Sequence, residues 1–173
     1  ASGARALNKN TTGDYNSASG YESMYSNTTG SYNAASGARA LNKNTTGDYN
    51  SATGYSALYS NTTGSYNAAT GSQALTNNTS GSYNIANGTE SLANNTSGSY
   101  NIASGYQALN SNTIGSYNIA IGNKAGENNK GSSNVFVGNN SCSNLTNASS
   151  TLCIGGVNPL ISGNFSSQRV LID

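Results

Sequence analysis

The chain of 173 residues contains no histidine, and only 8% of its residues are charged. Without histidine, the commonest general base and a frequent zinc ligand are both missing. The six carboxylates are dispersed along the chain, and no base accompanies its many serines and threonines. We therefore expect no enzymatic activity, no metal site and no cofactor.

Basic side chains and long apolar runs are also scarce, which limits the partners of the chain. Seven basic residues are scattered among six acidic ones, so no basic stripe for nucleic acid exists. No apolar run is long enough to cross a membrane, so we expect no membrane insertion. Hydrophobic residues make up only 34% of the chain, but a net charge of +1 and apolar residues held in strict register indicate order rather than disorder.

A short polar motif recurs along the chain, as in NTTGSYNAA from Asn61 to Ala69. The glycine of this motif returns every 17 residues from Gly13 to Gly115, and a second glycine keeps the same interval from Gly3 to Gly122. A period this short, with two glycines in each unit, is typical of a solenoid in which each unit forms one coil. We predict an all-β, parallel β-solenoid (β-roll) of about seven to eight 17-residue coils, with residues 1–137 as the repeat and residues 138–173 as a C-terminal capping segment.

Two apolar columns recur within the units, and we expect them to fill the interior of the coils. We predict about two short strands per coil, roughly ARAL and YNSAS, with glycine at both bends. The last unit, from Gly122 to Val137, is one residue shorter than the others. The predicted core ladder consists of Leu7, Leu41, Leu58, Leu75, Leu92, Leu109, Ala18, Ala35, Ala52, Ala69, Ala86, Ala103 and Ala120.

The residues that flank the alanine column change along the chain, from Ser, Ala and Thr in the first four units to Ile in the later ones. Neighbours in a strand point to opposite faces, so these residues point outward if the alanines point inward. An outward isoleucine row requires a partner, and another copy of the chain is the simplest one. The opposite orientation, with the isoleucines inside, is the alternative. The predicted oligomer interface comprises Ile85, Ile102, Ile119 and Ile121.

Asparagine and tyrosine also recur in columns. Stacked asparagines can form hydrogen-bonded ladders between coils about 4.8 Å apart, and the tyrosines would stack in the same way. For the tyrosine row, a sugar-binding or protein-binding stripe is the alternative. The asparagines of one bend also lie in Asn-X-Ser/Thr triplets, which are glycosylation acceptors in a secreted protein. These candidate acceptors are Asn10, Asn27, Asn44, Asn61, Asn78 and Asn95.

Two cysteines, Cys142 and Cys153, enclose ten residues after the last repeat. Their spacing does not match a metal site. Either the two thiols form a disulfide or both are buried and free, and we favour the disulfide. A disulfide would stabilise the terminal cap by about 2 to 3 kcal/mol and would favour an oxidising, extracellular setting.

The stretch GSYNIAIGNKAGENNKGSSNVFVGNNS, from Gly115 to Ser141, resembles the head repeats of trimeric autotransporter adhesins and the similar repeats of phage and viral tail fibres. The ending NPLISGNFSSQRVLID, residues 158–173, is similar to the segment that closes such arrays in fibre proteins. The resemblance implies a left-handed parallel β-roll, three copies of which form an elongated extracellular head. The chain departs from the family in its longer repeat and in the Ser or Ala of its first four strands.

The sequence therefore favours an extracellular structural or adhesive domain, located on a cell surface or a virion fibre. As a homotrimer it would display a repetitive surface to a host receptor, a glycan or a matrix protein. An ice-binding solenoid is one alternative, because Thr and Ser recur in rows. A subunit of a self-assembling filament is another, because an uncapped coil is an open strand edge.

Overall fold

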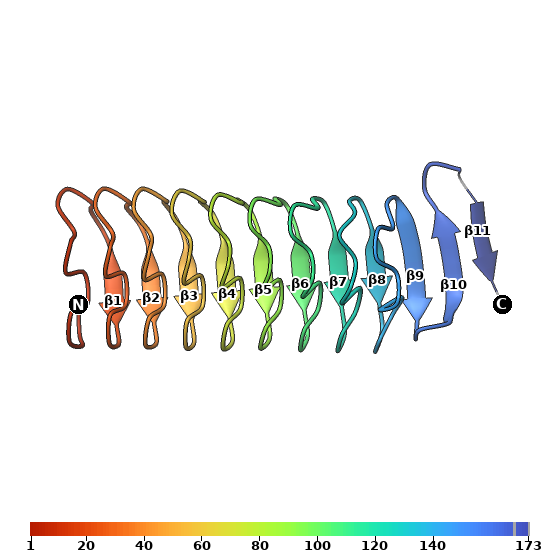
Figure 1. Cartoon of the computed structure of the whole chain (residues 1–173), viewed down its shortest axis with the longest axis horizontal. Coiled ribbons are helices and arrows are strands. Elements are labelled where there is room, and N and C mark those ends of the chain that lie inside the picture. The colour runs from red at the N-terminus through yellow and green to blue at the C-terminus, as the bar shows by residue number, and fades with distance from the viewer. Residues whose placement is uncertain (168, 173) are drawn as a thin grey trace.

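The computed structural model describes residues 1–167 and 169–172 and consists of a stack of coils that ends in antiparallel strands (Figure 1). Its strands form one sheet in which the spatial order follows the chain. The predicted all-β, parallel solenoid with a 17-residue repeat is confirmed. The strands are β1 (Ser17–Ser19), β2 (Ala34–Ser36), β3 (Ser51–Thr53), β4 (Ala68–Thr70), β5 (Ile85–Asn87), β6 (Ile102–Ser104), β7 (Ile119–Ile121), β8 (Val135–Val137), β9 (Thr151–Gly155), β10 (Pro159–Asn164) and β11 (Arg169–Ile172).

Strands β1 to β9 pair in parallel, and each coil contributes one strand to the sheet. The register places equivalent residues opposite one another, so that Ala18 pairs with Ala35 and Ala120 with Phe136. Columns in the sequence therefore become ladders in space, with the spacing of neighbouring strands in a sheet.

Each coil contains one short strand instead of the two that the sequence predicts. The ARAL segment is a turn, because Arg5 and Leu7 have φ angles of 61° and 52°, and the same left-handed backbone recurs in the later coils. The YNSAS strand is shorter than predicted, because Tyr15 also has a positive φ of 56°. Non-glycine residues rarely adopt this conformation. Hydrogen bonds between coils help to hold it, as when the Leu7 N–H donates to the Ser23 carbonyl at 3.1 Å.

The two glycines of each coil are required for different reasons. Gly20 has a φ of 133°, in a region that side chains with a Cβ seldom adopt. Gly64 lies outside that region, but a Cβ added there would be 2.3 Å from the carbonyl oxygen of Gly81 in the next coil. The first glycine column thus permits both the bend and the close approach of successive coils, because a Cβ at Gly20 would also lie 2.6 Å from the Gly37 carbonyl, whereas the second column permits the close approach alone.

The alanine and leucine columns lie inside the coils. The seven alanines of the predicted core ladder are at most 4% exposed, and the five leucines from Leu41 to Leu109 are fully buried, as is Met24 in the same column. Leu7 is only partly buried, because it belongs to the first coil of the stack. The alternative with isoleucine inside is wrong, since these isoleucines are exposed.

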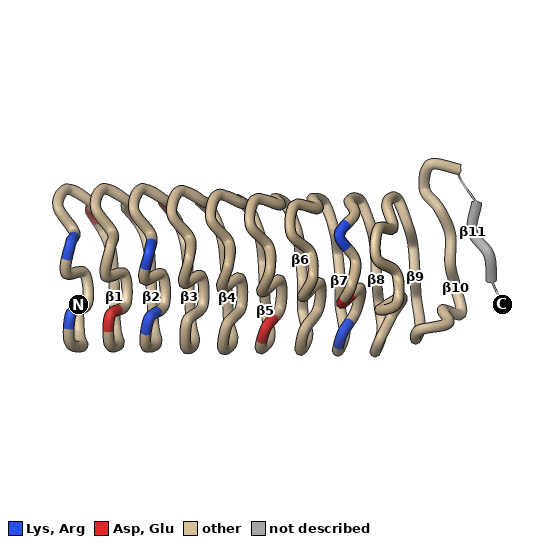
Figure 2. Tube along the Cα trace, viewed as in Figure 1, with Lys and Arg blue, Asp and Glu red and all other residues tan. Residues whose placement is uncertain are grey.

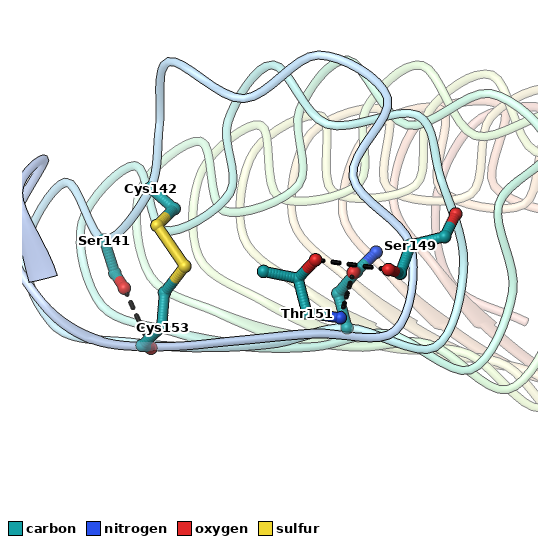
Figure 3. The surroundings of a disulfide bond; sticks show 6 residues. Ser141, Cys142, Ser149, Thr151 and Cys153 are labelled. Atoms are coloured by element: carbon teal, nitrogen blue, oxygen red, sulfur yellow. Dashed lines mark hydrogen bonds between the residues drawn. A yellow bond between two sulfur atoms is a disulfide. The ribbon is translucent and has the colours of Figure 1, made fainter. Parts of the chain in front are cut away.

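The coils that follow Ile121 fill the same interior with different pairs of side chains. Gly126 stands in the leucine column and Phe136 in the alanine column, and the phenyl ring occupies the space beside Gly126. In the next coil both positions are cysteines, Cys142 and Cys153, whose disulfide spans a Cα–Cα distance of 6.2 Å (Figure 3). The structure therefore contains the favoured disulfide, which replaces a leucine–alanine contact of the core.

The parallel stack extends past the predicted end of the repeat at residue 137. Strand β9 pairs in parallel with β8, and Ile154 lies opposite Val137, so residues 138–155 form a further coil. The antiparallel strands β10 and β11 follow it as the cap. Gln168 and Asp173, which belong to the predicted cap, lie outside the described residues.

Candidate functional site

One continuous surface of the stack is the sheet face, which we define as the outward first and third residues of strands β1 to β8. In β1 to β7 the first residue is exposed and the middle alanine is buried. The sheet face is three residues wide and runs along the stack, because parallel pairing aligns every strand. It therefore offers two rows of side chains that differ in chemistry from coil to coil.

The sheet face of β1 to β4 carries only Ser, Ala and Thr. Because these side chains are small, a shallow cavity of about 240 Å³ lies over the first three strands. Ser17, Ser19, Ser36 and Thr53 are among the residues that line it. The sheet face is therefore hollowed over β1 to β3, where serine and threonine hydroxyls lie among alanine side chains.

The sheet face from β5 onward is mainly apolar, with Asn87 and Ser104 as the polar outer residues of β5 and β6. Parallel pairing places Ile85 beside Ile102 and Ile102 beside Ile119, and Ile121 ends the same strand as Ile119. The exposed fractions of these four residues are 48%, 37%, 36% and 47%. The structure thus brings together all four residues of the predicted interface. Contiguous exposed apolar side chains of this kind are typical of interaction surfaces.

A second exposed feature is the tyrosine ladder, the seven stacked tyrosines from Tyr15 to Tyr117. Neighbouring ring centroids are 4.8 to 5.1 Å apart, with interplanar angles of 1° to 15°. Desolvation raises the pKa of Tyr49, and repulsion from Tyr32, Tyr66 and Asp48 raises it further. Inner rings are 47% to 49% exposed, whereas the end rings of Tyr15 and Tyr117 are 78% and 62% exposed.

The asparagine ladder explains why the predicted glycosylation acceptors are poor candidates. The Asn61 Nδ2 donates to the Asn44 Oδ1 at 2.8 Å and to the Gly64 carbonyl at 2.9 Å. The Asn78 Nδ2 donates in turn to the Asn61 Oδ1 at 2.8 Å. N-glycans attach to Nδ2, and in five of the six acceptors this atom is enclosed. The residues that are fully buried are Asn27, Asn44, Asn61, Asn78 and Asn95.

In the folded stack these five asparagines are therefore enclosed hydrogen-bond partners of the neighbouring coils. Asn10, the sixth acceptor, is half-buried in the first coil, and its Nδ2 donates to the Gly13 carbonyl at 2.9 Å. A glycan at any inner rung would remove hydrogen bonds that hold two coils together. The column has a structural role, which the sequence also indicated.

The shortened bend after Gly122 interrupts several ladders at the same level, and we call this place the step. The missing residue falls in the Thr12 column, so the side chain of Ile114 has no counterpart in the next coil and is 67% exposed. Within the described part of the chain, the buried Oδ1 atoms of Asn112 and Asn129 find no hydrogen-bond donor. Each unpaired buried acceptor costs about 1 to 3 kcal/mol. Sequence reasoning noted the short unit but not this consequence.

Charged side chains are too dispersed to form a site in the part of the chain that the structure describes (Figure 2). Glu22 lies 3.3 Å from Arg5 and 3.5 Å from Arg39, and Lys124 lies 3.2 Å from Glu127. Such exposed pairs contribute little to stability. Among the described residues, no group of Cys, Asp or Glu side chains is placed to hold a metal ion, and no helix is long and apolar enough to cross a membrane.

Comparison of the chain with protein-family models, with curated proteins and with solved structures finds no match. Its own geometry offers two surfaces, the sheet face and the tyrosine ladder, and one irregularity, the step.

Proposed function

We propose that the chain is a structural segment of an extracellular fibre or adhesive head, carried on a cell surface or a virion. In this proposal, three copies pack through the sheet face from β5 onward and leave their other sides free for attachment. The observation that carries the proposal is the set of four exposed isoleucines on three adjacent strands. The resemblance to adhesin head and tail-fibre repeats supports the number three.

The hydrophobic effect supplies the driving force for this association. Burying apolar surface contributes about 25 cal/mol for each Å² removed from water, and every isoleucine of the row would be buried once in each copy. The sheet face is only three residues wide, which is roughly 10 Å. Three strips this narrow can surround one axis.

The disulfide between Cys142 and Cys153 supports the extracellular part of the proposal, because such bonds persist mainly in oxidising compartments. The repetition of the outer surface supports a role in display. Many equivalent weak contacts along one rod give strong overall attachment, provided that they engage together.

The test is the mass of the chain in solution, measured by sedimentation equilibrium with and without reductant. We expect a mass near three chains. Replacing Ile119→Asp and Ile121→Asp together should give a monomer, because six carboxylates would meet at the axis. Placing the same charges in the other half, by Ser51→Asp and Thr53→Asp, is the matched control and should leave the trimer largely intact.

A monomeric wild-type chain would overturn the proposal, as would a trimer that persists after the Ile119→Asp and Ile121→Asp changes. A mass that grows without limit with concentration would instead support the filament, whose coils continue from one chain to the next.

The row of Ser19, Ser36, Thr53 and Thr70 favours one second candidate, an ice-binding surface. These hydroxyl side chains are exposed and recur once per coil on the sheet face. Thermal hysteresis of freezing, measured on the wild type and on a Thr53→Val, Thr70→Val variant, tests this candidate. Absence of hysteresis in the wild type would exclude it.

A further inference from the structure

We infer that the step is a binding site for the pyranose ring of a sugar, which stacks on the free face of Tyr117. The inference deepens the proposed attachment function by naming a place and a ligand class. It does not depend on the sheet face, so the site and the trimer can fail separately.

The free face of Tyr117 arises because the tyrosine ladder stops there. Tyr100 covers one face of the Tyr117 ring, with centroids 5.1 Å apart and planes 2° apart. On the other side, the position of the next tyrosine is held by Ser133, whose N–H donates to the Ser116 carbonyl at 2.9 Å. Ser133 has a φ of 61°, close to the 60° of Tyr117, so the backbone of the ladder continues while the ring is missing.

The space left by the missing rings is long enough for a ligand. Ser150 occupies the same column one coil further on, with its N–H donating to the Ser132 carbonyl at 3.0 Å. Two rungs without a ring leave on the order of 10 Å along the stack. A ring stacked on Tyr117 at the usual contact distance of about 3.5 to 4.0 Å fits within this length.

The chemistry around the free face suits a sugar. A pyranose presents C–H bonds on its face, which contact an aromatic ring, and hydroxyls at its rim. Ser133 is exposed and Ser150 half-buried, so hydroxyl partners lie beside the rim. The side chain of Ile114, three residues before Tyr117 on the same bend, adds apolar surface and is 67% exposed. A flat aromatic ligand would contact the ring but leave the serine hydroxyls unused.

The irregularity of the step also points to a binding site. The coils before the step satisfy their asparagine ladder, whereas the Oδ1 atoms of Asn112 and Asn129 have no donors in the described part of the chain, and Leu145 takes the place of asparagine in the coil that follows. Local departures from an otherwise consistent design are expected at functional sites, where stability is not the only requirement.

The experiment is saturation-transfer NMR on the wild-type chain with the methyl glycosides of glucose, galactose and N-acetylglucosamine as probes. At least one probe should bind, and the protons on one face of its ring should receive the strongest transfer. Tyr117→Ala should weaken that binding about tenfold, and Tyr117→Phe should retain it. Tyr55→Ala, at a tyrosine that is 51% exposed outside the ladder, is the matched control and should bind as the wild type does.

Ser133→Tyr combined with Ser150→Tyr supplies the decisive variant, because it fills both rungs without a ring and covers the free face of Tyr117, at two positions whose backbone already has the φ of the ladder. It should weaken sugar binding at least tenfold while its circular dichroism stays that of the wild type. The inference is overturned if none of the three probes binds, if Tyr117→Ala or the double variant binds like the wild type, or if indole binds in place of the sugars. Sedimentation of the same variants reports on the trimer independently.

Discussion

The half of the sheet face on β1 to β4 and the half from β5 onward have the same backbone and different surfaces. In both halves the strand pairs with its neighbour in the same parallel register, and the central alanine is at most 4% exposed. In the first half the outer residues are Ser, Ala and Thr, with a shallow cavity above them. In the second half they are mainly isoleucines.

The comparison separates the residues that build the coil from those that are free to serve a partner. Inward columns and the two glycine columns persist in both halves, because each side chain there contacts the coil above and the coil below. The outward residues of the strands are not constrained by the packing of the interior. A change from serine to isoleucine there alters what the surface binds and leaves the stack intact.

The largest expected effect is a loss of stability on replacing a glycine of the second glycine column, and it should be the same in the two halves. A Cβ at Gly47 would lie 2.3 Å from the carbonyl oxygen of Gly64, and one at Gly98 would lie 2.2 Å from that of Gly115. Gly47→Ala and Gly98→Ala should therefore each lower the free energy of unfolding by about 3 kcal/mol. Urea unfolding followed by circular dichroism checks this, and tolerance of alanine in one half only would contradict a shared scaffold.

The next largest effect should be a weaker association of the chains, without a loss of folding, when the isoleucine row is replaced. Exchanging Ile85, Ile102, Ile119 and Ile121 for serine gives the second half the surface of the first, so the trimer should weaken at least about tenfold while each chain stays folded. The reciprocal exchange of Ser17 and Ser51 for isoleucine should strengthen association. Sedimentation equilibrium measures both, and equal masses for all variants would show that the difference between the halves has no role in assembly.

Reduction of the disulfide should affect the two halves unequally. Cys142→Ser with Cys153→Ser should lower the local free energy of opening by about 2 to 3 kcal/mol, because the crosslink closes a loop with a sequence separation of 11. Hydrogen exchange should therefore accelerate in β8 and β9 and stay unchanged in β1 to β4. Uniform acceleration along the stack would mean that the coils unfold as one unit.

The smallest effect concerns Tyr49, whose pKa is raised by desolvation and by Tyr32, Tyr66 and Asp48. Above about pH 10 the unfolded chain loses this proton before the folded chain does, so stability should fall as the pH rises toward the folded pKa. Asp48→Ser copies the residue that precedes Tyr83 in the second half and should lower the pKa of Tyr49. The difference in tyrosinate absorbance between the wild type and Tyr49→Phe isolates the titration of Tyr49. An unchanged titration of Tyr49 after Asp48→Ser would exclude the Asp48 carboxylate as a cause of the raised pKa.

Several parts of the candidate surfaces followed from the sequence, and others did not. The position of Ile119 and Ile121 beside an inward alanine follows from alternation along a strand, so their exposure could be predicted. The burial of Asn61 could not be predicted, because an asparagine at a bend serves equally well as a glycan acceptor and as a buried hydrogen-bond partner. Its neighbours in the adjacent coils decide between them.

The sequence by itself determined the solenoid, its period and its inward columns, because a repeat without insertions can satisfy every coil with the same contacts. Tertiary structure alone decided that Leu7 lies in a turn, since a hydrogen bond to the next coil, from the Leu7 N–H to the Ser23 carbonyl, helps to hold leucine at positive φ. It also decided that Cys142 and Cys153 fill the place of a leucine and an alanine, and that Ser133 lies where a further ring would cover the face of Tyr117. These outcomes depend on what lies one coil away, 16 or 17 residues along the chain, where local sequence preferences have no influence.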